Sequence, residues 1–138
     1  MAEKCCCGGP TILLFPCGGG SDVGELTDRA ARKLTKEGWG RIYCLAGVGA
    51  HIENFLENTK LADRIIAIDG CPSACASKTL SHVGFKPRVI LLKKAGFMKG
   101  SSPVNEENIS KLCDFIRNSV EGEDREKKLN EKGGCCKY

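Results

Sequence analysis

Equally spaced cysteines constrain the fold of this chain more than any other feature. Cys17, Cys44 and Cys71 follow one another at intervals of 27 residues, a length that accommodates one strand, one helix and their connections. Each lies at or just beyond the end of a short apolar run typical of a β-strand, and a segment with helical periodicity follows each run. This alternation predicts an α/β domain with a mainly parallel sheet.

The individual elements follow from hydrophobic periodicity and capping residues. Four apolar runs are predicted as strands, at residues 11–15, 41–45, 64–69 and 88–92. The first helix is expected to start near Ser21 and to stop before Gly38, a glycine suited to the position after a helix end. Further helices are expected at about 49–58, 73–84 and 105–120, with Asn105 as the N-cap of the last. The helix at 49–58 is expected to bury three apolar residues, Ile52, Phe55 and Leu56.

The cysteines also predict the order of the strands. Parallel strands end at the same edge of a sheet, so Cys17, Cys44 and Cys71 should meet at the carboxyl edge, where ligands bind in open α/β sheets. Neighbouring strands lie about 4.8 Å apart, and the sulfurs around a tetrahedral zinc lie roughly 3.8 Å apart. A central first strand places Cys17 next to both of the others, which favours the order 2-1-3-4. We therefore expect a three-layer αβα sandwich with a four-stranded parallel sheet of the flavodoxin-like or Rossmann-like type.

One domain flanked by two tails is expected. A chain of 138 residues, 41% of them hydrophobic, suits a single modest core, which we place at residues 11–120. Residues 1–10 form a Cys-rich tail. Residues 121–138 carry five acids and five bases with one aliphatic residue, a composition typical of disorder.

Charge and cysteine content limit the classes of function. The net charge of +4 is too small to indicate nucleic-acid binding. The longest apolar run, residues 11–15, is far too short for a membrane span and lacks the flanks of a secretory signal, so we expect a cytoplasmic protein without a membrane partner. Ten cysteines in a chain without an export signal favour metal or redox chemistry over structural disulfides.

Cys75 completes a candidate set of four metal ligands. It follows Cys71 at CxxxC spacing, which places it in the first turn of the third helix, facing the same edge as the other three. Four thiolates around Zn²⁺ leave a net charge of −2, and the helix N-termini at this edge would offset part of that charge. The backbone amides of the following loop form a candidate anion nest beside the metal, at Gly18, Gly19, Gly20 and Ser21.

Other residues and motifs near this edge point less directly to function. His51 is more typical of a helix surface than of a ligand. Asp69 is expected to fix the turn at Gly70 by hydrogen bonds or, alternatively, to support the metal ligands from behind. Cys113 lies on the apolar stripe of the last helix, which indicates core packing. A phosphatase or arsenate-reductase loop is disfavoured, because no arginine stands six residues after any of the three evenly spaced cysteines.

Three segments carry a family resemblance. They are FPCGGGSDVGELTDRAARKL, YCLAGVGAHI and IDGCPSACASKTL, and the triplet Asp69-Gly70-Cys71 lies in the third. They resemble the DGC-domain family, to which zinc binding through four characteristic cysteines is ascribed, and the similarity covers about residues 12–99. The resemblance implies that the metal is held by Cys17, Cys44, Cys71 and Cys75, and it implies no particular reaction.

Two functions of different classes fit these residues. The favoured one is a zinc-binding protein with a structural, sensing or metal-carrier role, because all-cysteine sites are typically closed rather than catalytic. The alternative is a redox protein that uses an iron–sulfur cluster on the same thiols or a reversible Cys71–Cys75 disulfide. The metal ion is the expected partner, and a protein partner cannot be read from these residues.

The tails contain five further cysteines, here called the terminal cysteines: Cys5, Cys6, Cys7, Cys135 and Cys136. The predicted topology brings both tails to the edge of the sheet opposite the metal site. The terminal cysteines are therefore a candidate second site for a soft ion such as Cu(I) or Zn²⁺. The alternative interpretation is two disordered tails with exposed thiols.

Overall fold

A four-stranded parallel sheet forms the centre of the molecule. The structure, a computed structural model, describes residues 9–132, and for residues 125–132 it describes the backbone alone. The strands are β1 (Ile12–Pro16), β2 (Arg41–Ile42), β3 (Arg64–Asp69) and β4 (Arg88–Leu91). They lie in the order β2-β1-β3-β4, and all three pairings are parallel. The order predicted from the cysteine positions is confirmed.

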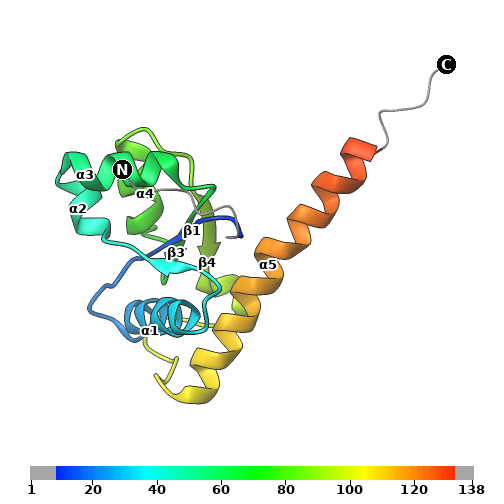
Figure 1. The fold of residues 1–138 in the computed structure, drawn as a ribbon. Coiled ribbons are helices and arrows are strands. Elements are labelled where there is room, and N and C mark those ends of the chain that lie inside the picture. Colours follow the sequence, from blue (N-terminus) through cyan, green and yellow to red (C-terminus); the bar gives the residue numbers. More distant parts are fainter. Residues whose placement is uncertain (1–8, 133–138) are drawn as a thin grey trace.

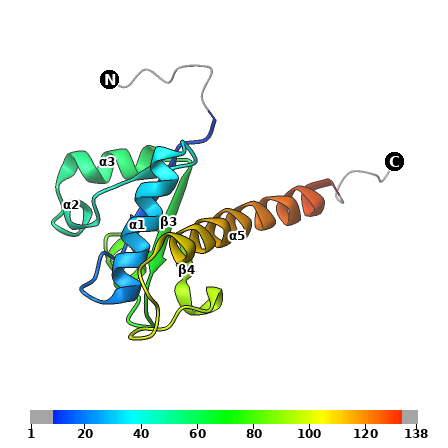
Figure 2. The same cartoon turned by 90° about the horizontal axis from the view of Figure 1, so that it is seen from below.

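Helices cover both faces of the sheet and complete a three-layer sandwich (Figures 1 and 2). α1 (Asp22–Lys36) and α5 (Glu106–Lys132) pack together on one face, while α2 (Leu45–Gly49), α3 (Glu53–Leu61) and α4 (Cys75–His82) lie on the other. A short 3-10 helix, η1 (Leu92–Ala95), follows β4. The predicted α/β class is confirmed. None of the helices within residues 9–132 is both long and apolar enough to cross a membrane.

Alternate strand residues build two hydrophobic cores, one on each face of the sheet. Leu14 and Ile66 pack with buried residues of α1 and α5. Leu13, Phe15 and Ala67 point to the opposite face, where they pack with buried residues of α2 and α4. This burial on both faces explains why β1 and β3 are continuous apolar runs rather than alternating ones.

The first and last helices begin where the sequence predicts. The Ser21 hydroxyl accepts a hydrogen bond from the Gly24 amide at 3.2 Å and caps α1, and Gly38 has a left-handed φ of 74° just past the end of that helix. Asn105 precedes α5, and its side-chain oxygen accepts a hydrogen bond from the Asn108 amide at 2.8 Å. These caps satisfy amides of the first helical turn that have no partner within the helix.

The region after Ile42 differs from its prediction. β2 ends at Ile42, and the single helix expected at 49–58 is replaced by α2 and α3. Between them, His51 has a left-handed φ of 59°, which interrupts the helix. The prediction that Ile52 is buried is wrong, since Ile52 precedes α3 and is 48% exposed. The two helices contact each other closely, because a Cβ atom on Gly47 would lie 2.8 Å from the ring of Phe55.

The start of α4 and the end of β4 also differ from the sequence prediction by a short distance. α4 begins at Cys75 rather than near Ser73, because Ala74 adopts a left-handed conformation with φ 52° and cannot belong to a right-handed helix. β4 ends at Leu91, where the chain turns into η1. Both shifts occur at connections, where local backbone geometry decides the boundary and periodicity carries little information.

Helix α5 is longer than the sequence predicts. It continues to Lys132, beyond residue 120, and its last turns extend away from the sheet (Figure 1). Ion pairs connect it to the beginnings of two strands, Arg64 with Asp124 at 2.5 Å and Arg88 with Glu123. The division of the chain into a domain at 11–120 and two tails stays a prediction. The terminal cysteines lie outside the described residues.

Candidate metal-binding pocket

A cavity at the carboxyl edge of the sheet brings together three of the predicted cysteines. Cys17, Cys71 and Cys75 line this cavity, here called the thiol pocket, which has a volume of about 370 Å³. The N-cap of α1 and the first residue of α4 both belong to its lining, so two helix N-termini border it with partial positive charge. The remaining lining residues are Gly19, Gly20, Ser21, Gly70, Ser73 and Lys99.

The end of β1 positions Cys17. Its amide donates a hydrogen bond to the Ile68 carbonyl at 2.9 Å, which extends the pairing between β1 and β3. The half-buried Cys17 sulfur lies 3.5 Å from the hydroxyl oxygen of Thr27, a fully buried residue of α1. Because the Thr27 hydroxyl donates its proton to the Gly24 carbonyl at 2.7 Å, its oxygen accepts a hydrogen bond from the Cys17 thiol.

Asp69 attaches the start of α4 to the end of β3. Its carboxylate is 1% exposed and accepts hydrogen bonds from the amides of Ala76 at 2.8 Å and Ser77 at 3.2 Å. The residue that precedes α4, Ala74, has no side chain able to cap the helix. Asp69, seven residues before Ala76, therefore takes the place of a local N-cap. It holds the helical turn that begins with Cys75.

Glycine is required where the turn after β3 crosses the start of α1. A Cβ atom on Gly70 would lie 2.9 Å from the carbonyl carbon of Val23 in α1. Beside this crossing, a Cβ atom on Gly24 would lie 2.7 Å from the carbonyl carbon of Gly19, in the loop that precedes α1. Side chains cannot enter such backbone contacts without moving one of the two segments. This crossing fixes the distance between the backbone segments that carry the first and third cysteines.

Polar and charged groups surround the Cys71 thiol in the pocket. Hydrogen bonds from the hydroxyl and the backbone amide of Ser73 lower the pKa of the Cys71 thiol, and the positive charge of Lys99 adds to this effect. Burial and the negative charge of Asp69 oppose it. Cys71 is half-buried, whereas Cys75 is exposed. The pocket thus favours the thiolate form of Cys71, the form that binds metal ions and reacts as a nucleophile.

Cys44 lies outside the lining of the thiol pocket. It is the N-cap of α2, and its exposed sulfur accepts a hydrogen bond from the Gly47 amide at 3.3 Å. Within residues 9–132, no group of three or more His, Cys, Asp or Glu side chains is arranged so that it could hold a metal ion. The four-cysteine site therefore stays a prediction, with three members around one pocket and Cys44 outside its lining.

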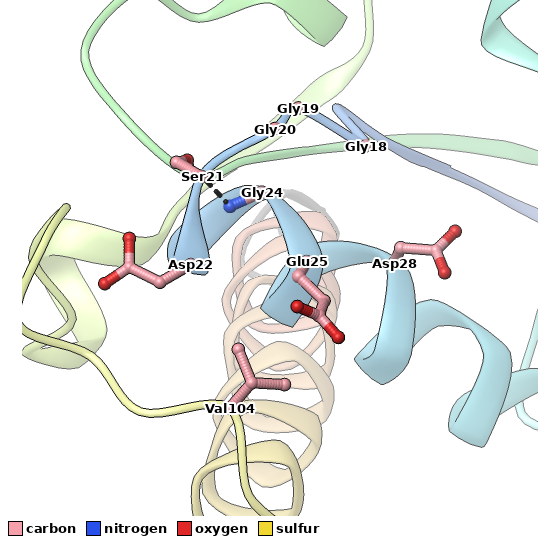
Figure 3. Close-up of a pocket in the computed structure, with 9 residues that line it drawn as sticks. All are labelled: Gly18, Gly19, Gly20, Ser21, Asp22, Gly24, Glu25, Asp28 and Val104. Carbon is pink, nitrogen blue, oxygen red and sulfur yellow. Dashed lines mark hydrogen bonds between the residues drawn. The ribbon is translucent and has the colours of Figure 1, made fainter.

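A second cavity (Figure 3) borders the Gly18–Ser21 loop, of which Gly19, Gly20 and Ser21 also line the thiol pocket. It is lined by this loop and by three carboxylates of α1, Asp22, Glu25 and Asp28. Their negative charge opposes anion binding in this cavity. The Gly18 amide already donates to the Thr27 hydroxyl at 3.4 Å. The predicted anion nest is thus better suited to the side that faces the thiol pocket, and it remains a prediction.

Sequence reasoning missed three residues of this region. Thr27 is a polar residue on the apolar stripe of the first helix, and that position was its available signal. Ser73 stands between Cys71 and Cys75, where a hydroxyl is close to both by chain geometry alone. Lys99 carried no signal, since it is an exposed lysine in a loop, and only the tertiary structure brings it to the pocket.

The remaining candidates lie away from the thiol pocket. His51 is an exposed residue of the connection between α2 and α3. Cys113 is 1% exposed and donates a weak hydrogen bond to the Ala30 carbonyl at 3.6 Å, which confirms its role in core packing. Burial raises the pKa of the Cys113 thiol to about 11.

Comparisons with known proteins identify relatives of this chain. The sequence profile of the DGC domain matches residues 13–116, a region that contains Cys17, Cys44, Cys71 and Cys75. The anaerobic and virulence modulator AnvM of Pseudomonas aeruginosa is 30% identical over 91 residues, which cover 65% of this chain and 70% of AnvM. No solved structure matches the chain.

Proposed function

Because the chain belongs to the DGC-domain family, we propose that it is a metal-binding protein that holds zinc through cysteine thiolates at the thiol pocket. The observation that carries this proposal is the presence of Cys17, Cys71 and Cys75 around one cavity. They come from the ends of two adjacent strands and from the first turn of α4. Core packing does not account for the exposed Cys75, and Cys17 and Cys71 remain partly exposed although each packs against the edge of a core.

The donor chemistry of the pocket fits zinc, a borderline-soft ion that cysteine thiolates bind well. The described residues contain no preassembled group of three donors. We therefore propose that the ion itself draws the cysteines together, as expected where metal binding is coupled to local folding. Cys44 would complete a four-coordinate site after releasing its cap on α2. Bound zinc would then cross-link the carboxyl edge of the sheet.

The open pocket supports a sensing or carrier role more than a purely structural one. Cys75 is exposed and the other two thiols are half-buried, so an ion can enter and leave without unfolding the domain. The relative AnvM is named a modulator, which also supports sensing. We place this function in the cytoplasm, where thiols are kept reduced.

Metal analysis of anaerobically purified protein tests the proposal. The full-length chain with its terminal cysteines replaced by serine isolates the pocket. We expect about one zinc per chain and no visible absorption band, and single changes Cys17→Ser, Cys71→Ser and Cys75→Ser should each reduce bound zinc strongly. Cys113→Ser is the matched control and should bind as the parent does. Full zinc retention in two of the three pocket variants would contradict the proposal.

Redox chemistry is a second candidate, favoured by the position of Cys71 and Cys75 in one pocket, four residues apart in the sequence. Their two thiols would form a disulfide by losing two electrons and two protons to a low-molecular-weight disulfide, which is reduced to two thiols. An iron–sulfur cluster on the pocket cysteines is the other redox form, and its visible absorption would identify it in the metal analysis. Alkylation and mass measurement in defined thiol–disulfide buffers would detect the Cys71–Cys75 bond.

A further inference from the structure

Lys99 lies at the tip of a tight turn rather than in a loose loop. Phe97, two residues earlier, is 8% exposed and anchors the turn in the core. The Ser102 hydroxyl accepts a hydrogen bond from the Met98 amide and donates one to the Met98 carbonyl, both at 2.8 Å. These contacts close the turn around Lys99 and limit the positions that its backbone can adopt.

Asp22 connects this turn to the start of α1. Its carboxylate accepts hydrogen bonds from the Gly100 amide at 2.9 Å and from the Ser102 amide at 3.0 Å. These amides lower the pKa of Asp22 and so favour its ionised carboxylate. Figure 3 shows the Asp22 side chain directed away from those of Glu25 and Asp28. Asp22 thus ties the turn to the helix whose N-terminus borders the thiol pocket.

The attached turn places a positive charge where a metal–thiolate complex needs one. Lys99 lines the thiol pocket with Cys17, Cys71 and Cys75, and its charge acts on the Cys71 sulfur. Zinc bound by three thiolates carries a net charge of −1, and by four a net charge of −2. Without a nearby cation, such a complex is costly to hold in a partly buried pocket.

We infer that Lys99 supplies the counter-charge of the metal–thiolate complex, and that Asp22 is the positioning residue that holds Lys99 over the pocket. This inference rests on the proposed zinc-binding function. It explains why a carboxylate at the start of α1 accepts hydrogen bonds from amides about 80 residues away. The turn at Met98–Ser102, which contributes no cysteine, would then serve to carry Lys99 to the thiol pocket.

Zinc affinity, measured by competition with a chromophoric chelator, tests this inference. The parent is the full-length chain with serine at the terminal cysteines, held under reducing conditions. Lys99→Gln should weaken zinc binding about three-fold to ten-fold at low salt, the range for one partly solvated charge interaction. Lys99→Arg should keep the affinity within two-fold. The matched control is Lys94→Gln, which removes an exposed charge of η1 that is absent from the pocket lining.

Salt distinguishes a charge effect from a structural one. The difference between the parent and Lys99→Gln should shrink in about 1 M salt, because the screening length there is only about 3 Å. Asp22→Asn should weaken zinc binding as Lys99→Gln does, but it should add nothing further in a Lys99→Gln background. Such non-additivity would show that Asp22 acts through Lys99. Thermal melts of each variant without zinc check that the fold is retained.

The outcomes separate this inference from the proposed function. If the parent binds no zinc, the proposed function fails. If the parent binds zinc and Lys99→Gln binds it equally well, the inference alone is overturned. It is also overturned if Asp22→Asn weakens binding by the same factor with and without Lys99. Loss in Lys99→Gln, recovery in Lys99→Arg and convergence at high salt together support it.

Discussion

Replacement of Asp69 should destabilise the domain more than any other single change of a polar side chain near the pocket. Its carboxylate holds two buried amides of α4, those of Ala76 and Ser77. Asp69→Ala leaves both amides without their partner in a buried site, since Ala76 and Ser77 are 0% and 9% exposed. An unpaired buried amide costs about 1–3 kcal/mol. We expect a loss of about 3–4 kcal/mol in the free energy of unfolding, a large share of the 5–15 kcal/mol typical of a domain.

Asp69→Asn keeps the size of the side chain but removes one of its two acceptor oxygens, so it separates the contribution of the hydrogen bonds from that of packing. The asparagine oxygen can still accept one bond, while its amide group faces the second N–H, so we expect a loss of about 1–2 kcal/mol. The matched control is Asp28→Ala, which removes a surface ion pair with Arg32 worth about 0.3–0.5 kcal/mol. Urea denaturation followed by circular dichroism measures all three changes.

The reactivity of the Cys75 thiol gives a local measurement beside the global unfolding free energy. Because Asp69 caps the turn that begins with Cys75, loss of the cap should loosen that turn and speed alkylation of the Cys75 thiol in the folded protein. The reasoning is refuted if Asp69→Ala costs no more than Asp28→Ala and leaves the rate of Cys75 alkylation unchanged.

Three further predictions test other parts of the structure. Gly70→Ala and Gly24→Ala should each lower the free energy of unfolding in urea denaturation by about 1–3 kcal/mol, because the new Cβ atom overlaps the backbone. Gly20→Ala, with open space around it, should change that free energy little. Equal effects of all three changes would contradict the close backbone contacts at Gly24 and Gly70. The Cys113 thiol has its folded pKa raised to about 11 from 9.0, so its contribution to stability is present below pH 9 and is lost as pH rises toward 11. Relative to Cys113→Ala, the parent should lose about 1 kcal/mol between pH 8 and pH 10, and parallel stability curves would show that this thiol does not titrate as described. Removal of zinc with a chelator should lower the melting temperature, and an unchanged melt after proven removal would exclude a stabilising role for the ion.

Much of the fold could be predicted because several sequence signals agree. The strand order followed from where Cys17 must lie relative to Cys44 and Cys71, and the sheet adopts that order. The caps at Ser21 and Asn105 were also predictable, since a capping residue acts on amides only two or three positions away.

The site was less predictable because its polar contacts span long sequence distances. Asp22 meets Gly100 and Ser102 only through tertiary packing, and no local pattern marks Lys99. The place of Cys44 depended on a two-residue strand and on a helix interrupted at His51. A single left-handed residue makes that interruption, and apolar periodicity does not detect it.

The glycine crossing between α1 and the turn after β3 divides the surroundings of the thiol pocket into two classes of position. At Gly24 and Gly70 one backbone segment lies directly against another. Only glycine fits there, whatever ion or reaction the pocket serves. Ser73 and Lys99 line the pocket with their side chains, which can change in size or charge without displacing these backbone segments. Substitutions at positions such as Ser73 and Lys99 can therefore change which ion a related chain prefers and how tightly it binds that ion, while the backbone positions of the cysteines stay the same.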